Sequence, residues 1–404
     1  MNPILVTGRG CVSALGLDRA SFADRLLRGL SGIGPIRRFD ASQLQVQVAA
    51  EVPDYQEKEY FTDSQIQQLD PFAQYGLLAA REAIAEARLD FSTPLAQRTA
   101  VIIGTGAGGQ ETQERGYHRL MVQNAKRLHP FTVPKLIHSS VASQISITHG
   151  ITGPVFTTSS ACASAGHAMG MALLLLRSGM VDVAITGGTE ACVTFGTVRA
   201  WEGLRVMAPD TCRPFCKQRS GMVLGEGAGV LILETRASAE ARGVAGLAEL
   251  AGFGMSSDAY NLVQSRVEGP TQAMAAALQD AGMRPEEIDY INAHGTGTTL
   301  NDVIETQAIH TLFGPHARQL AVSSTKSMHG HTLGAAAALE AIACIEALQR
   351  QVAPATLNFL DPDPACDLDY LPNEARAMPI RAVLNNSFAF GGLNTSLLFK
   401  RCQD

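Results

Sequence analysis

Short apolar runs rich in β-branched residues alternate along the chain with longer segments of helical periodicity. The segments 70–87 and 167–179 predict helices. The second of these is apolar on most sides, as expected of a helix buried between two sheets. Buried strands bounded by glycine are predicted at 4–8, 99–104, 181–188 and 229–234. This alternation predicts an α/β architecture.

The same layout begins again near residue 245. The segment 246–261 resembles the N-terminal segment, because in both a strand runs into a glycine-bearing turn. Further helices are predicted at 269–282, 301–313 and 332–350, and further strands at 288–298, 320–325, 382–388 and 395–400. We therefore expect two similar α/β halves, 1–244 and 245–404, with the boundary in 240–244.

Composition and charge narrow the class of protein. The 404 residues are 46% hydrophobic and 17% charged, which favours a well-packed soluble globule. The net charge of −6 provides no overall positive field for nucleic acid or an anionic membrane. No apolar stretch is long enough to span a membrane, and no basic leader precedes the first apolar run. We expect a cytoplasmic protein.

The eight cysteines are scattered through the sequence, which is typical of reduced thiols. The one close pair, Cys212 and Cys216, lacks the partners of a zinc site, so buried thiols are expected there. His329 and His331 also lack a nearby cysteine or carboxylate that would complete a ligand set. We expect no metal.

The segment "GTGAGG" (104–109) matches the pattern G-x-G-x-x-G and follows a predicted strand. A dinucleotide-binding fold needs an acidic residue about 20 positions further on to hold the ribose. The sequence there reads "NAKRLHPFTVP" and contains no acidic residue. A tight turn is the better interpretation.

Cys162 lies where the strand-like "VFTTSSA" leads into the helix predicted at 167–179. A thiol at a helix N-terminus is close to the positive end of the helix dipole, which favours the thiolate, and the free N–H groups there can bind an oxyanion. Small residues surround the cysteine. By itself the segment favours a small packing residue over a nucleophile.

Three further stretches carry chemical groups. "NAHGTGT" (292–298) and "STKSMHGHTLG" (324–334) place His294 and His331 beside glycines near predicted strand ends, with Lys326 five residues before His331. "NNSFAFGGLN" (385–394) is either a hairpin turn or a flexible flap. A cysteine, two histidines, a lysine and an oxyanion loop fit acyl transfer through a thioester.

Together these motifs resemble the elongating β-ketoacyl-[acyl carrier protein] synthases, which are condensing enzymes of the thiolase superfamily. The resemblance spans essentially the whole chain, and "SSACASAGHA", "NAHGTGT", "STKSMHGHTLGAAAALE" and "NNSFAFGGLN" recur in the family's order and spacing. It implies a thiolase-like fold, in which two α/β halves stack as a five-layered αβαβα sandwich.

The resemblance implies a catalytic role for several residues. Cys162 matches the residue that carries the acyl group, and His294 and His331 match the pair that assists malonyl decarboxylation. Lys326 and Glu340 match a pair that organises the active-site electrostatics. The oxyanion hole and gate match Cys162, Phe388, Phe390 and Gly391, with Phe390 as the gate residue.

Substrate and partner contacts are implied in the same way. Thr296 and Thr298 match threonines that bind the pantetheine arm, and Ala107 borders the acyl pocket, where a larger residue is common. Lys126 and Arg127 match part of a basic patch that docks the acyl carrier protein, although 63–70 lacks the rest of that patch. No cofactor is expected beyond the carrier's phosphopantetheine. A homodimer is expected, or a heterodimer with a related subunit.

Two other functions are weighed against this one. A thiolase acting on coenzyme A needs a second cysteine in the C-terminal loop, where this sequence has Phe388 and Phe390, and Cys402 lies only in the tail. A non-catalytic chain-length-factor subunit typically lacks the cysteine that is present here as Cys162. Departures such as His329, where threonine is common, favour a specialised polyketide, polyene or nodulation-type pathway over fatty acid synthesis, without excluding the latter.

Overall fold

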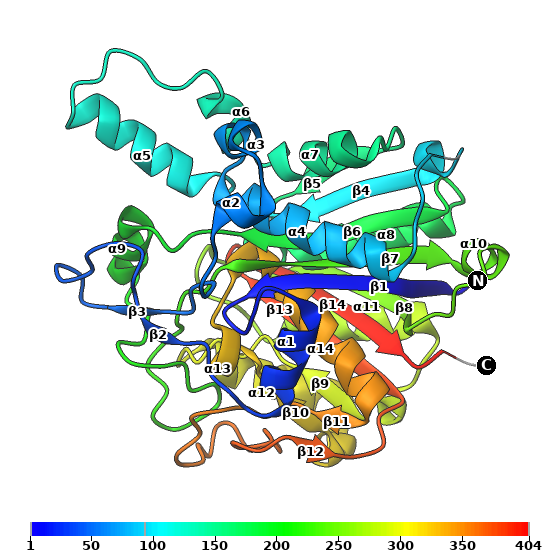
Figure 1. Cartoon of the computed structure of the whole chain (residues 1–404). Coiled ribbons are helices and arrows are strands. Elements are labelled where there is room, and N and C mark those ends of the chain that lie inside the picture. The colour runs from blue at the N-terminus through cyan, green and yellow to red at the C-terminus, as the bar shows by residue number, and fades with distance from the viewer. Residues whose placement is uncertain (1, 93, 403–404) are drawn as a thin grey trace.

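Ten strands form one continuous mixed sheet in the computed structural model, which describes residues 2–92 and 94–402 (Figure 1). From edge to edge the strand order is β10-β9-β13-β14-β8-β1-β7-β6-β4-β5. The strands of this sheet are β1 (Ile4–Ser13), β4 (Thr99–Gly104), β5 (Val155–Thr158), β6 (Val183–Glu190), β7 (Gly227–Thr235), β8 (Ala248–Ser257), β9 (Tyr290–Asn292), β10 (Ala321–Ser323), β13 (Ala382–Ala389) and β14 (Leu393–Lys400).

The sheet consists of two five-stranded halves with the same topology. In the first half the order is β1-β7-β6-β4-β5, and in the second it is β8-β14-β13-β9-β10, so each half places its first, fifth, fourth, second and third strand side by side. The orientations also agree, since the first two pairings of each half are antiparallel and the last two are parallel. The halves meet where β1 pairs with β8 at Leu5 and Val6. The predicted repeat is therefore confirmed.

Helices cover both faces of each half and fill the space between the halves. The central helices α8 (Ser164–Arg177) and α14 (Ala336–Arg350) pack against each other and against strands of both halves. Helices α4 (Pro71–Glu86) and α7 (Ser140–His149) cover the outer face of the first half, and α11 (Glu268–Ala281) and α12 (Asn301–Phe313) that of the second. The result is the five-layered sandwich that the resemblance to the β-ketoacyl synthases implies.

Glycines allow the outer helices to lie directly on the first strand of each half. A Cβ at Gly10 would lie 2.1 Å from the carbonyl oxygen of Ala79 in α4. A Cβ at Gly254, on the equivalent strand β8, would lie 1.9 Å from the carbonyl oxygen of Ala273 in α11. The weak sequence echo between the halves thus reflects one shared packing constraint.

Most of the predicted elements match the structure within a few residues, and the segments 99–104 and 301–313 match β4 and α12 in full. The strand predicted over 288–298 is wrong in its extent, because β9 ends at Asn292. Beyond it the backbone turns through Gly295 and Gly297, both in left-handed conformations, and its N–H groups bond to carboxylates of α12 instead of a neighbouring strand. The predicted boundary after residue 244 stays a prediction; it falls between α10 (Arg236–Ala241) and β8.

An arm that the hydrophobic pattern does not predict projects from the body (cyan, upper left of Figure 1). It comprises α5 (Gln110–Met121), α6 (Thr132–Leu136) and the loop between them. Its apolar side chains are unusually exposed, with Met121 at 76% and Val122 at 65%. Among the described residues, no helix is long and apolar enough to cross a bilayer.

The remaining α-helices and strands are short and lie around these layers. They are helices α1 (Arg19–Leu27), α2 (Glu57–Tyr60), α3 (Asp63–Gln68), α9 (Phe195–Gly203) and α13 (Lys326–His329), and the two-residue strands β2 (Gly34–Pro35), β3 (Val48–Ala49), β11 (Val352–Ala353) and β12 (Arg376–Ala377).

Replacing Gly254 with alanine is expected to lower the free energy of unfolding by about 3 kcal/mol, because the added methyl group would push α11 away from β8. Urea denaturation monitored by circular dichroism measures the change. Gly34→Ala serves as the matched control, since nothing lies within 4 Å of a Cβ at that strand position. Equal denaturation midpoints for the two variants would contradict the close approach of α11.

Candidate active site

A strained turn between β5 and α8 presents the sulfur of Cys162. The preceding residue, Ala161, has φ +49°, a conformation that costs energy for a residue with a Cβ. Ser164 holds the turn in place, since its hydroxyl donates to the Ala161 carbonyl at 2.6 Å and accepts from the N–H of Ser160 at 2.9 Å. The small residues around Cys162 therefore build a defined turn that presents the sulfur just before α8.

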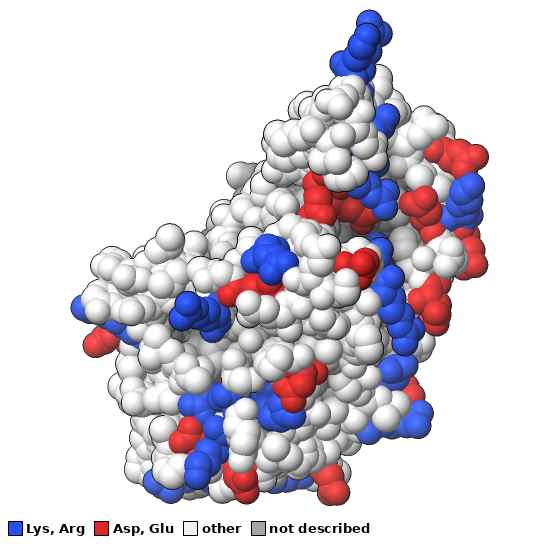
Figure 2. Space-filling view, turned by 90° about the vertical axis from the view of Figure 1, so that its left-hand side faces the viewer, with Lys and Arg blue, Asp and Glu red and all other residues white. Residues whose placement is uncertain are grey.

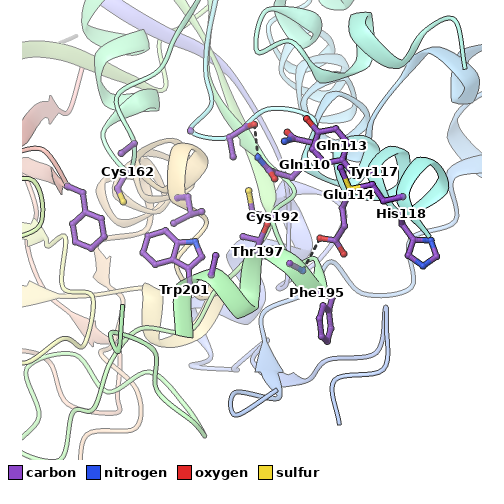
Figure 3. A pocket seen from close by; sticks show the side chains of 18 of the residues that line it. Gln110, Gln113, Glu114, Tyr117, His118, Cys162, Cys192, Phe195, Thr197 and Trp201 are labelled. Atoms are coloured by element: carbon purple, nitrogen blue, oxygen red, sulfur yellow. Dashed lines mark hydrogen bonds between the residues drawn. The ribbon is translucent and has the colours of Figure 1, made fainter. Parts of the chain in front are cut away.

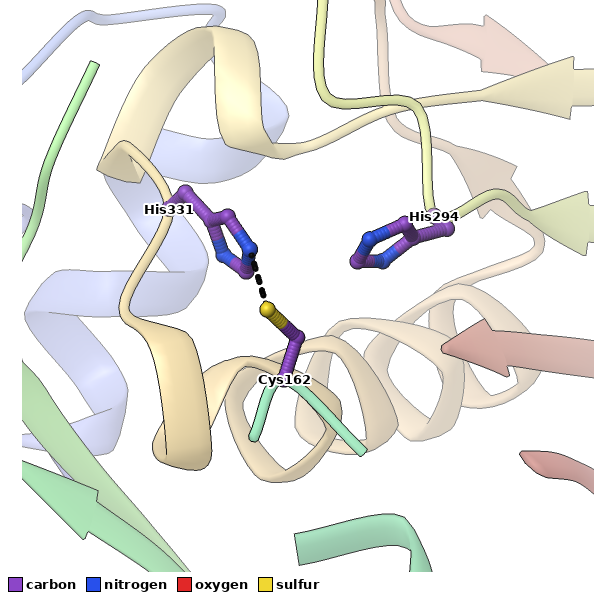
Figure 4. Close-up of side chains that lie close together, drawn as sticks. All are labelled: Cys162, His294 and His331. Carbon is purple, nitrogen blue, oxygen red and sulfur yellow. Dashed lines mark hydrogen bonds between the residues drawn. The ribbon is translucent and has the colours of Figure 1, made fainter. Parts of the chain in front are cut away.

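Two histidines from the second half of the chain lie beside this sulfur (Figure 4). His331 Nε2 lies 3.0 Å from Cys162 Sγ, and the rings of His294 and His331 are 5.4 Å apart in an edge-on arrangement. The backbone of His331 is fixed by its N–H, which donates to the carbonyl of Val223 at 2.7 Å. All three side chains are buried. The sequence-predicted cysteine and histidines thus form one cluster.

The loop that carries His294 is held by two carboxylates that sequence reasoning missed. Glu305 of α12 accepts from the N–H groups of His294 and Gly295 at 2.9 and 2.8 Å. Asp302, one turn earlier, accepts from the N–H of Gly297 at 3.2 Å. Both acids are fully buried. The sequence could have indicated them, because two acids three residues apart begin a helix that directly follows the histidine loop.

Lys326 and Glu340 form a buried ion pair behind the histidines. The Lys326 ammonium also donates to the carbonyl oxygen of His294 at 2.6 Å. Its positive charge therefore lies behind the backbone of one histidine and close to the other residues of the cluster. The pair predicted from the sequence is present, and it connects α13 to α14.

The electrostatics of the site keep both histidines neutral. Burial, and next the positive charge of Lys326, hold the pKa of His294 and His331 well below the ordinary value for histidine. Within the described part of the chain the Nδ1 atoms of both rings are buried without a hydrogen-bond partner. A buried N–H without an acceptor is costly, so the tautomer with hydrogen on Nε2 is favoured. Each ring can then donate a hydrogen bond into the site.

The state of Cys162 differs from the expectation at its helix N-terminus. Burial raises the pKa of the thiol to about 12, and the negative charge of Glu190 acts in the same direction. Lys326 opposes these effects without overcoming them. Desolvation of the thiolate outweighs the helix dipole here, so the resting group is a protonated thiol.

Two cavities meet at Cys162. The larger, of about 760 Å³, extends from Cys162 past Ala107 and Cys192 to one face of α5 (Figure 3). The smaller, of about 150 Å³, is lined by both histidines, Thr296 and Thr298. The two threonine hydroxyls lie 2.9 Å apart. A reacting group can therefore approach the sulfur from either side.

Phe390 and Trp201 stand between the cavities, since both side chains line each of them. Their rings stack at 5.7 Å with an interplanar angle of 24°. Phe390 follows β13 and precedes Gly391 and Gly392, whose positive φ values form the hairpin turn to β14. The N–H of Gly391 bonds to the carbonyl of Leu262 at 2.7 Å. The segment 385–394 is thus both a hairpin and a wall of the site.

Other residues singled out in the sequence take different places. Phe388 lies against His294, with ring centroids 6.2 Å apart, and also lines the smaller cavity. His329 points away from the sulfur: its ring nitrogens bond to the Thr325 hydroxyl and the Gly330 carbonyl. Lys126 and Arg127 lie in the exposed loop at the end of the arm and line neither cavity.

The cysteine and the two histidines also form a set of soft metal ligands. Their ligand atoms all lie within 4.8 Å of one another. Among the described residues no fourth histidine, cysteine or carboxylate joins this set. The two neutral histidines and the thiol fit acyl transfer as they stand.

Comparisons with known proteins agree with this chemistry. The family model "Beta-ketoacyl synthase, N-terminal domain" matches residues 1–239, and "Beta-ketoacyl synthase, C-terminal domain" matches residues 247–360. Nodulation protein E from a Rhizobium species is 46% identical, and the match covers 98% of this chain and 99% of that protein. The 3-oxoacyl-[acyl-carrier-protein] synthase 2 of Staphylococcus aureus is 40% identical, with 98% of each chain covered.

Solved structures extend the comparison. The ishigamide ketosynthase/chain length factor superposes with a TM-score of 0.95 at 33% identity, over the full length of both chains. A type II polyketide ketosynthase in complex with its acyl-carrier protein and bound to the hexaketide superposes with a TM-score of 0.90 at 29% identity, covering 99% of this chain and all of that one.

Iodoacetamide is expected to alkylate Cys162 slowly at about pH 7 and steadily faster towards about pH 10, because the thiolate is the reactive form and a raised pKa delays its formation. Mass spectrometry of the peptide that contains Cys162 measures the rate, and Cys162→Ser identifies its signal. A rate that levels off below about pH 8 would show an activated thiolate and contradict the protonated resting state.

Proposed function

This chain belongs to the β-ketoacyl synthase family, and from that membership we propose which residues perform the reaction and which acyl chains it elongates. It is a β-ketoacyl-[acyl carrier protein] synthase, an acyltransferase that condenses an acyl thioester with a malonyl thioester. One observation carries the assignment of residues: Cys162 Sγ lies 3.0 Å from His331 Nε2 at the point where two cavities meet.

In the first step the thiol of Cys162 takes the acyl group. Its sulfur attacks the thioester carbonyl, the bond to the pantetheine sulfur breaks, and the proton of the thiol ends on the departing pantetheine sulfur. The Nε2–H of His331 faces the Cys162 sulfur and stabilises its negative charge as it forms. The acyl chain then occupies the larger cavity, because that cavity leads away from the sulfur on the side opposite the histidines.

In the second step a malonyl thioester enters the smaller cavity and loses carbon dioxide. The electron pair left behind forms an enolate, whose oxygen accepts hydrogen bonds from the Nε2–H groups of His294 and His331. Neutral histidines suit this role, since they donate without first having to be protonated. Lys326, paired with Glu340, holds the His294 backbone and adds a positive charge behind the site.

In the third step the enolate carbon attacks the acyl carbonyl on Cys162. The oxyanion of the tetrahedral intermediate is bound by the backbone N–H groups of Cys162 and Phe390, in a pocket completed by Phe388 and Gly391. The carbon–sulfur bond to Cys162 then breaks and the thiolate takes up one proton. The product is a 3-oxoacyl thioester, and the enzyme returns to its protonated resting state.

The substrates are carried on the phosphopantetheine of an acyl carrier protein. Thr296 and Thr298 line the smaller cavity, where their hydroxyls suit the amide groups of a pantetheine arm. The three steps need no cofactor of the enzyme's own, because the thiol and the neutral histidines supply the chemistry. A related polyketide ketosynthase has been solved with its acyl-carrier protein, which supports a carrier as the partner.

Docking of the carrier relies little on charge. Lys126 and Arg127 are proposed to contact the acidic carrier from the end of the arm. On the face drawn in Figure 2, however, basic and acidic side chains are interspersed, and broad neutral areas separate them. This mixture supports a dedicated carrier that is bound with weak charge steering.

The chain is proposed to act as a dimer. Met121 and Val122 on the arm are apolar and largely exposed, and both also line the outer end of the larger cavity. A second subunit placed there would cover apolar surface and close the cavity at once. A homodimer and a heterodimer with a chain-length-factor subunit both meet this need, and related structures include ketosynthase/chain length factor complexes.

The pathway is proposed to be a specialised one rather than general fatty acid synthesis. The face of α5 that borders the larger cavity carries polar side chains at helical spacing, namely Gln110, Gln113, Glu114, Tyr117 and His118. The rest of the cavity lining is mainly apolar and accommodates hydrocarbon, but a wholly saturated chain offers these polar groups no partner at the α5 end. These polar groups favour a substrate whose acyl chain carries oxygen atoms or conjugated double bonds. The likeness to nodulation protein E also favours a specialised pathway.

The two competing functions fit less well. A chain-length factor without activity has no use for the complete set of Cys162, His294 and His331. A thiolase needs a second cysteine as a base near the first in the C-terminal loop. Cys402 does not meet that need, because its sulfur lies beside Gly246, which precedes β8, and it lines neither cavity.

Cys162→Ala is expected to abolish acylation of the protein by an acyl-loaded carrier, as measured by intact mass. His294→Ala and His331→Ala are expected to slow malonyl decarboxylation about 10²–10³-fold, because each removes one donor to the enolate oxygen. His329→Asn, at a third histidine outside the cavities, is the matched control and should keep decarboxylation. Acylation of the Cys162→Ala protein at the wild-type level would refute the assignment.

Ala107→Phe is expected to block the larger cavity just beyond Cys162. Transfer of a dodecanoyl group to Cys162 should fall at least about tenfold, whereas transfer of an acetyl group should change little, since steric discrimination of this size is usual for an apolar pocket. Intact-mass kinetics with both primers measure the ratio. An unchanged ratio would mean that the acyl chain lies elsewhere.

A further inference from the structure

The glycine loop at 104–109 encloses a carboxylate of the chain itself. The N–H groups of Gly106 and Ala107 and the hydroxyl of Thr105 donate to Glu190 at 2.7, 3.2 and 3.0 Å. Glu190 is the last residue of β6, next to β4, which leads into the loop. A loop whose sequence resembles a phosphate-binding turn therefore binds an internal anion.

The same carboxylate also binds the turn that follows His331. The N–H of Gly334 donates to Glu190 Oε2 at 2.9 Å, beside the bond from Gly106 to the same oxygen. A Cβ at position 334 would lie 2.6 Å from this oxygen and 2.3 Å from the nitrogen of Gly106. Only glycine allows the two segments to come this close together.

Glu190 is fully buried and has no cationic partner among the described residues. Its oxygens are satisfied by backbone N–H groups and one hydroxyl donor. Burying a charge without a counter-ion is costly, and most such groups in folded proteins are paired. We therefore expect the Glu190 carboxylate to contribute to function as well as to stability.

The segments that Glu190 connects form the wall of the larger cavity next to the catalytic sulfur. Gly106, Ala107, Cys192 and Leu333 all line that cavity, and each belongs to a segment bonded to Glu190 or directly adjoins one. The turn that contains Leu333 and Gly334 begins two residues after His331. The carboxylate thus connects the wall that the acyl chain touches to the turn that carries a catalytic histidine.

We propose that Glu190 is a positioning residue that fixes the acyl-cavity wall against the His331 turn and thereby determines which acyl chains Cys162 accepts. The proposal rests on the proposed function, in which the acyl chain bound to Cys162 lies in the larger cavity. It adds to that function a specificity element that touches neither the substrate nor the reacting atoms.

Glu190→Gln tests the proposal with almost no change in shape. The amide nitrogen cannot accept a hydrogen bond, so whichever way the amide turns at least one N–H group bonded to residue 190 loses its acceptor and the wall loosens. The ratio of dodecanoyl to acetyl transfer onto Cys162, measured by intact mass, is expected to change by about tenfold or more. A wild-type ratio in the folded variant would overturn the proposal.

The pH dependence of Cys162 alkylation provides a second readout that a purely structural role would not move. Lys326, Glu340, His294 and His331 also face the sulfur, and both histidines are neutral there. Removing the negative charge of Glu190 makes the thiolate easier to form, so the alkylation profile of Glu190→Gln should shift to lower pH. An unshifted profile would contradict the placement of this charge beside the thiol.

Glu234→Gln is the matched control. Glu234 is another fully buried carboxylate and forms an ion pair with Arg242. It lies on the adjacent strand β7, at the other end of the β6–β7 pair from Glu190. Its loss is expected to lower stability and leave both the acyl-chain ratio and the alkylation profile at wild-type values. A change in ratio equal to that of Glu190→Gln would count against a specific role for Glu190.

Thr105→Val keeps the proposal testable if Glu190→Gln does not fold. It removes one donor to the carboxylate and retains the charge, so a smaller change in the acyl-chain ratio is expected with no shift of the alkylation profile. An unchanged ratio in this folded variant would overturn the proposal. Failure of the proposed function itself looks different, because the wild-type protein would then accept no acyl group on Cys162.

Discussion

The contact between the central helices α8 and α14 determines where every reactive group lies. All residues from Ala336 to Leu348 are buried, and glycines at 166 and 170 bring α8 against side chains of the second half, so the two helices can only lie between the halves of the sheet. Cys162 precedes α8 and His331 precedes α14, each after the third strand of its half. Packing these helices together therefore brings the two residues, which are far apart in sequence, into contact.

Around this contact the protein buries an unusual number of ionisable groups and satisfies each in a different way. Lys326 and Glu340 neutralise one another, Glu305 is held by two backbone N–H groups, and Glu190 by donors from two segments. The charges of these groups and the loss of water around them both act on the protonation of Cys162, His294 and His331. As a result the reacting groups are uncharged at rest, a protonated thiol and two neutral imidazoles, and these groups take on negative charge only while the reaction proceeds.

Sequence reasoning reached the architecture because a buried sheet requires periodic apolar strands, and these are visible at 99–104 and 382–388. It singled out Cys162 and its histidines through their combined motifs, whereas the local residues around Cys162 alone favoured a packing role. It placed the end of the strand before His294 too late, because the acceptors that turn the chain lie in a later helix. The role of Glu190 was out of reach for the same reason: its donors are more than eighty residues before it and more than a hundred after it. The protonated state of Cys162 could not be predicted either, because the burial that raises its pKa exists only once the core has assembled.

The stacking of Phe390 on Trp201 gives the protein a built-in optical signal. Trp201 is the single tryptophan of the chain, so all indole emission comes from the boundary between the two cavities. Any movement of Phe390 that separates the rings changes the polarity around this one fluorophore. Stopped-flow fluorescence of the unlabelled enzyme can therefore time the opening of that boundary, independently of product formation, during a single turnover.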